Sequence, residues 1–230
     1  MHARLFMFTV AFALCFVEAT SASAQPIDQI PMYGGMNRTE TPDLRAADEK
    51  FISDTVQKYG SRERAGAAFV ENGFAYYGRD DLANAMRRFN QAWLLDASNP
   101  EVYFGFAVVL HDKRQNCDAA KQFEKAASFG KYVKGMAPDA GRVLVLCAVQ
   151  DKSLSAEAKQ SLFTRSDALY AEALASEPNK GYVYASMASA MYWRDNFEQA
   201  WVYVKLARTN GGRLPEPFLR LLREKLQEPA

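Results

Sequence analysis

Helical repeats are easiest to see in residues 69–100, which read FVENGFAYYGRDDLANAMRRFNQAWLLDASNP. Small and aromatic residues recur there at fixed spacings that return further along the chain. The three matching sets are Gly73, Tyr76, Ala85, Phe89 and Ala92; then Ala107, Leu110, Ala119, Phe123 and Ala126; then Ala188, Met191, Ala200, Val204 and Ala207. The first two sets are 34 residues apart at every position, and a period of that length is typical of a repeated pair of helices. Because one such pair cannot bury its apolar face alone, the pattern predicts several pairs stacked in series.

The composition is that of a folded globular protein. Hydrophobic residues make up 49% and charged residues 24% of the 230 positions, which is ordinary for a chain with a sizeable core. Basic and acidic residues nearly balance at 28 and 27, giving a formal charge of +1. So small a net charge exerts no long-range attraction on a polyanion, and we expect no nucleic-acid partner.

The first 24 residues differ from the rest. Arg4 precedes an apolar run from Leu5 to Val17, and Ala22-Ser23-Ala24 has the small-x-small pattern that signal peptidase cleaves. The run is shorter than the roughly 20 residues that a membrane-spanning helix needs, although a retained anchor is the alternative. We therefore expect residues 1–24 to be a signal peptide and the protein to be exported, to the periplasm of a Gram-negative bacterium or otherwise secreted, meeting membranes only through partners.

Residues 25–41 are rich in proline, glycine and polar side chains and lack a helical period. An extended or disordered arm is the simpler interpretation. The alternative is that the apolar residues Ile27, Ile30 and Met32 dock this arm in a groove of the helical domain.

The repeated spacing resembles that of the tetratricopeptide repeat, in the form found in exported bacterial proteins. The resemblance implies an all-α fold, a right-handed superhelical solenoid of antiparallel helix pairs over residues 42–227. We place about four repeats at 66–99, 100–133, 134–180 and 181–214. A helix starting at Pro42 caps the N-terminal end, and residues 215–227 form the C-terminal cap.

The third repeat departs from the pattern. Counted forward from Ala107, its first small residue is Gly141, whereas counted back from Ala173 it is Leu154, a difference of 13 residues. We expect the extra residues near 150–160, followed by an unusually long second helix at about 155–176.

We expect Cys117 and Cys147 to form a disulfide. They fall at the start of one helix and near the end of the next, which the repeat places at the same end of an antiparallel pair. An exported chain with two such cysteines favours a disulfide, and two buried thiols are the alternative.

Little in the sequence favours catalysis. Beyond the signal peptide His111 is the only histidine, so no histidine pair or histidine-based metal site can form. The chain has no glycine-rich phosphate loop and no Gly-x-Ser-x-Gly motif. We expect a protein that is not an enzyme and that binds no metal and no cofactor.

The resemblance implies that the first helix of each repeat lines a concave groove. The candidate lining residues are Val70, Glu71, Phe74, Tyr77, Phe104, Val108, His111, Tyr182, Ser189, Tyr192 and Trp193. This lining is aromatic and nearly free of cations. Since family members that grip the C-terminal carboxylates of cytosolic chaperones place Lys, Arg and Asn there, we do not expect that partner class. Some of these aromatics could instead belong to the core.

The expected function is that of an exported scaffold or adaptor that binds a protein or peptide segment through this groove, since Tyr and Trp are typical centres of protein interfaces. The alternative is a periplasmic carrier or chaperone-like subunit that holds an unfolded or apolar segment of an envelope protein.

Overall fold

The computed structural model describes residues 25–229, so the expected signal peptide lies outside the described residues. Within that range the chain forms ten α-helices and three short 3-10 helices without any strand, which confirms the all-α prediction. None of these helices is both long and apolar enough to cross a membrane. The helices are α1 (Pro42–Tyr59), α2 (Arg62–Tyr77), α3 (Leu82–Leu95), α4 (Pro100–Asp112), α5 (Asn116–Ala127), α6 (Met136–Gln150), α7 (Ala156–Ser176), α8 (Lys180–Trp193), α9 (Phe197–Thr209) and α10 (Glu216–Lys225).

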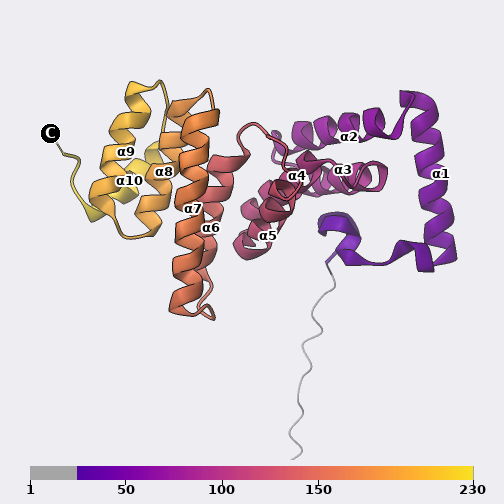
Figure 1. Ribbon diagram of the computed structural model, residues 1–230, viewed down its shortest axis with the longest axis horizontal. Helices are drawn as coiled ribbons and strands as arrows, with labels where there is room; N and C mark the ends of the chain where they lie inside the picture. The colour runs from indigo at the N-terminus through magenta and orange to yellow at the C-terminus, as the bar shows by residue number, and fades with distance from the viewer. Residues whose placement is uncertain (1–24, 230) are drawn as a thin grey trace, which may run out of the picture.

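Consecutive helices pack against one another as pairs, α2 with α3, α4 with α5, α6 with α7 and α8 with α9. The pairs follow one another through the molecule, with α1 at one end and α9 and α10 at the other (Figure 1). Capping side chains set several helix starts: the side chain of Ser61 accepts a hydrogen bond at the start of α2, as does that of Ser155 at the start of α7.

The small residues of the three matching sets lie between the paired helices. All of them are buried: Gly73, Ala85, Ala92, Ala107, Ala119, Ala126, Ala188, Ala200 and Ala207. Phe89 shows why small residues are needed, because a Cβ added to Gly73 or Gly105 would lie 2.4 or 2.3 Å from its ring. The helices can therefore approach closely only where side chains are absent or short.

Helix α6 contributes to two of the buried clusters that make up the core. Its residues Met136, Val143 and Leu144 join the cluster built on α2 to α5, whereas Ala137 and Val145 join the cluster built on α7 and α8. The long helix expected at about 155–176 is α7, which has 21 residues. Helix α6 meets the preceding pair mainly through α5, as α4 meets its own preceding pair mainly through α3.

The expected disulfide is present. Cys117 in the first turn of α5 and Cys147 in the last turn of α6 have sulfur atoms 2.01 Å apart and Cα atoms 4.7 Å apart. The disulfide therefore joins α5 to α6, the helix that contributes to both of these clusters.

Residues 25–41 are neither extended nor disordered. They form three 3-10 helices, Ile27–Gln29, Pro31–Gly35 and Arg38–Glu40, and the first two pack on α3. The fully buried Asn90 of α3 donates a hydrogen bond to the carbonyl of Ile30 at 2.7 Å and accepts one from the backbone N–H of Tyr33 at 2.9 Å. Since α3 is the second helix of its pair, the arm docks away from the expected groove.

Candidate functional site

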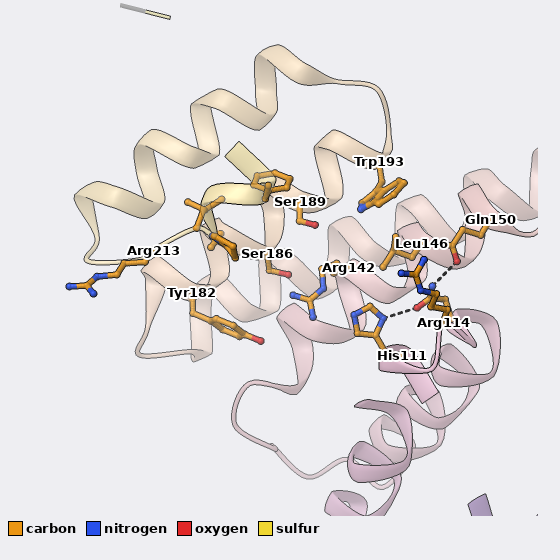
Figure 2. Close-up of a pocket in the computed structure, with 15 residues that line it drawn as sticks. His111, Arg114, Arg142, Leu146, Gln150, Tyr182, Ser186, Ser189, Trp193 and Arg213 are labelled. Carbon is orange, nitrogen blue, oxygen red and sulfur yellow. Dashed lines mark hydrogen bonds between the residues drawn. The ribbon is translucent and has the colours of Figure 1, made fainter. Parts of the chain in front are cut away.

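A hollow of about 610 Å³ lies between the end of α4, one face of α6, α8 and the segment that leads into α10. We call it the α6–α8 groove. Four of the expected lining residues contribute to it, namely His111, Tyr182, Ser189 and Trp193. Figure 2 shows their side chains converging from α4 and α8 on the space beside α6. Its volume is within the range of about 300–1,000 Å³ that is usual for ligand sites.

The other expected lining residues lie elsewhere. Val70 and Val108 are only 4% and 6% exposed and belong to the core, so their assignment to the groove is wrong. The reason is that Val70 on α2 and Val108 on α4 lie in one core cluster, on helices that contact each other, so neighbouring helices cover both positions. Glu71 is exposed on α2 and is not among the residues that line the groove.

The remaining expected aromatics pack against other rings. Phe74 lies edge-on to Phe89, with centroids 5.0 Å apart, and 5.4 Å from Phe104. Tyr77 and Phe104 are half-buried beside the same core cluster. Tyr192 is surrounded by Trp193, Phe197 and Phe218 at 5.5 to 5.7 Å. These residues therefore shape the core next to the groove and do not line it.

One end of the groove has a floor of hydrogen-bonded side chains. The buried amide of Asn116 donates from Nδ2 to Oε1 of Gln150 at 2.6 Å, and its Oδ1 lies 2.7 Å from Nδ1 of His111. Because Oδ1 can only accept, Nδ1 of His111 is the donor and Nε2 is the other ring nitrogen, free to accept in the neutral form. These contacts join α4, α5 and α6 beside the Cys117–Cys147 disulfide.

Arg142 stands at the centre of the groove on α6 (Figure 2). It forms an ion pair with Asp139 at 3.0 Å, and the hydroxyl of Tyr182 also donates to Asp139. Burial alone would lower the pKa of the guanidinium, but Asp139 and the phenol oxygens of Tyr182 and Tyr170 outweigh it, so the pKa is raised. Burial and the same Asp139 carboxylate raise the pKa of Tyr182. The groove therefore holds a charged arginine and a protonated phenol.

The repeat spacing did not indicate the arginines that line the groove. They are Arg114, Arg142 and Arg213, so the expectation that the lining is nearly free of cations is wrong for this part of the molecule. Arg142 could have been found, because it is the ninth residue of the third repeat, the position that Ser189 holds in the fourth. The broken spacing of the third repeat concealed it. Arg114 and Arg213 lie in turns outside the helices, where no helical period can place them.

The groove combines aromatic surface with hydrogen-bond donors, which is suited to binding another molecule. Exposed faces of Tyr182 and Trp193 lie beside donors from arginine, serine and tyrosine, and none of the residues that line the groove is acidic. In the part of the chain that the structure describes, no three His, Cys, Asp or Glu side chains are grouped to hold a metal ion.

Comparisons with protein-family models, curated proteins and solved structures find no match to this chain.

Proposed function

We propose that this protein is a non-catalytic adaptor of tetratricopeptide type that binds a segment of a protein partner in the α6–α8 groove. The observation that carries the proposal is the exposure of Tyr182 and Trp193, 38% and 39%, on the wall of a hollow that also holds Arg142. Tyr, Trp and Arg are the residues most enriched at the energetic centres of protein interfaces. A partner side chain would cover both rings and reach the guanidinium.

The proposed architecture is a right-handed solenoid in which α2, α4, α6 and α8 are the first helices of successive repeats. The order of the helix pairs and the burial of the small residues between them support it. Export through residues 1–24 is part of the same proposal, supported by the cleavage pattern at 22–24 and by the presence of a disulfide, which oxidising compartments favour.

A carrier of apolar segments is the second candidate, favoured by one observation. A hollow of about 340 Å³ lies between α5, α6 and α7 and is lined mostly by apolar side chains, among them Phe123, Met136 and Leu144. An ion pair between Glu124 and Arg165 lies at this hollow and joins α5 to α7. Such a hollow would suit an apolar side chain of a client protein.

The two candidates are separated by photo-crosslinking in cells. Trp193 is replaced by the photoreactive residue p-benzoylphenylalanine, which keeps an aromatic side chain in the groove. The matched control carries the same residue at Tyr132, which is 58% exposed and lies outside the groove. An adaptor gives one crosslinked partner at position 193 that is absent at position 132. A broad set of clients at position 193 would contradict an adaptor with one partner and leave the carrier as the candidate, and identical products at both positions would contradict a groove-specific adaptor.

A further inference from the structure

The α6–α8 groove carries positive charge that the chain itself only partly neutralises. Arg142 is paired with Asp139, but in the described part of the chain Arg114 forms no ion pair. Arg114 also borders a shallow hollow beside Cys117 that Asp118 and Asp151 line, yet it pairs with neither of them. In Figure 2 the side chain of Arg114 lies next to Leu146 and Gln150, whereas the guanidinium of Arg213 points away from the other labelled side chains. Arg114 and Arg142 are therefore the cations that an occupant would meet.

One carboxylate of the chain itself is already bound by the side chains of Arg142 and Tyr182. Asp139 receives hydrogen bonds from both Arg142 and Tyr182, so one carboxylate is already held by a guanidinium and a phenol. A guanidinium has more donors than this single bond to Asp139 uses. Those that remain, together with Arg114, are suited to a second carboxylate, which charge-assisted hydrogen bonds would hold.

Apolar surface lies next to these cations. Leu146 and Trp193 form one side of the groove, with Leu214 and Phe218 from the segment entering α10 on another. An occupant that fills the groove must therefore present an apolar side chain and an anionic group close together, which adjacent residues of a polypeptide can do.

We propose that the partner segment presents a carboxylate side chain beside an aromatic or large aliphatic side chain, the carboxylate binding Arg114 and Arg142 and the apolar group packing on Trp193. This inference rests on the proposed function and deepens it by giving the chemical class of the segment. We assign the carboxylate to an Asp or Glu inside the segment, and a free C-terminal carboxylate, the other source of the same group, is a separate arm of the test.

The test uses short synthetic peptides, blocked at both ends, whose binding to the mature protein is measured by calorimetry. One peptide carries Phe beside Glu, a second Phe beside Gln, and a third Ala beside Glu. A fourth has Phe and Gln with a free C-terminal carboxylate. The Phe-Glu peptide should bind roughly tenfold more tightly than the Phe-Gln peptide, since a hydrogen bond to a charged group is stronger by about that factor. The Phe-Glu peptide should also bind more tightly than the Ala-Glu peptide.

Variants locate the effect. Arg114→Gln, at an exposed turn, should remove most of the preference for Glu over Gln while leaving binding of the Phe-Gln peptide within about twofold. Arg142→Gln should do the same where circular dichroism shows that the fold is kept. The matched control is Arg45→Gln on α1, which removes the same charge from an exposed side chain and should leave both affinities unchanged.

Four outcomes would overturn the inference. Equal binding of the Glu and Gln peptides would refute the carboxylate contact and leave the adaptor proposal standing. Tight binding only of the peptide with the free C-terminus would assign the cations to a chain end. If no peptide binds while crosslinking at position 193 still captures one partner, the adaptor proposal survives and the inferred chemistry fails. If neither peptides nor a partner are captured, both fail.

Discussion

At the scale of single residues, one phenylalanine ring determines how closely three helices approach. Phe89 of α3 is fully buried, and its ring lies against the Cα atoms of Gly73 on α2 and Gly105 on α4. Phe74 and Phe106 pack edge-on against the same ring, with centroids 5.0 and 6.4 Å away. The ring therefore has no free space into which it could move.

We predict that Gly105→Ala lowers the free energy of unfolding by about 1–3 kcal/mol, the usual cost of forcing an extra methyl group into a packed core. The added Cβ would lie 2.3 Å from Cε1 of Phe89. Urea denaturation measures the loss. Gly78→Ala is the control, because its Cβ would meet only the backbone carbonyls of Phe74 and Ala75 at 3.4 and 4.0 Å, and its stability should not fall. Equal stability of both variants would contradict this account of the glycine.

A second prediction for a single residue concerns how the stability of the protein depends on pH. Asp81 begins α3 by accepting hydrogen bonds from the backbone N–H and the side-chain amide of Asn84 at 3.1 and 2.7 Å, and these bonds lower its pKa. A lowered pKa in the folded state means that this stabilisation is complete above the unfolded value of about 3.9 and is lost as the pH falls through the folded value. Asp81→Asn keeps an amide oxygen as a cap but has no charge to titrate. We expect its stability to depend less on pH between about pH 5 and 2 than that of the parent protein, and parallel curves would contradict the assignment.

At the scale of helices, the contact between α5 and α6 is the point at which the repeat pattern changes. The repeat spacing is interrupted in the third pair, and α6 contributes residues both to the cluster on α2 to α5 and to the cluster on α7 and α8. The Cys117–Cys147 disulfide and the Asn116–Gln150 hydrogen bond both cross this contact. Sequence spacing predicted the disulfide, but it did not predict that α6 contributes to two clusters of the core.

We predict that replacing both cysteines with serine lowers the free energy of unfolding by about 3.6 kcal/mol, the chain-entropy value for a loop of this length. The two cysteines are 30 residues apart. Urea denaturation of the double variant measures the loss, and the parent protein treated with a reducing agent should lose a similar amount. Mass labelling of denatured, unreduced protein should find no free thiol on Cys117 or Cys147. Two labelled thiols, or an unchanged midpoint, would contradict the role of the disulfide.

At the scale of the whole molecule, the aromatic residues fall into two groups. Phe74, Phe104 and Tyr192 pack against other rings at the edge of the core. Tyr182 and Trp193 keep more than a third of their surface exposed on the wall of the α6–α8 groove. Substitutions in the first group should therefore lower the stability of the protein, whereas substitutions in the second should weaken the binding of a partner.

We predict that Phe74→Ala costs about 3 kcal/mol of unfolding free energy because it removes a ring from the core. Trp193→Ala should cost about 1 kcal/mol or less, since its ring lies at the surface. Thermal or urea denaturation compares the two, and pull-down from an envelope extract compares their binding. Trp193→Ala should lose the partner that the parent protein retains. A large loss of stability for Trp193→Ala would place this residue in the core and remove the basis of the proposed groove.

The sequence by itself determined the all-α architecture, the positions of the helix pairs and the pairing of Cys117 with Cys147. These depend on local periodicity and on short separations along the chain, because a buried helix face must repeat at the helical period. Only the tertiary structure decided which side chains line the groove. Val70 and Val108 are covered by neighbouring helices, whereas Arg142 on α6 and Arg114 in the turn between α4 and α5 line the same groove as Trp193. Exposure depends on how helices rotate and slide against one another, and that is decided by the packing of the whole chain.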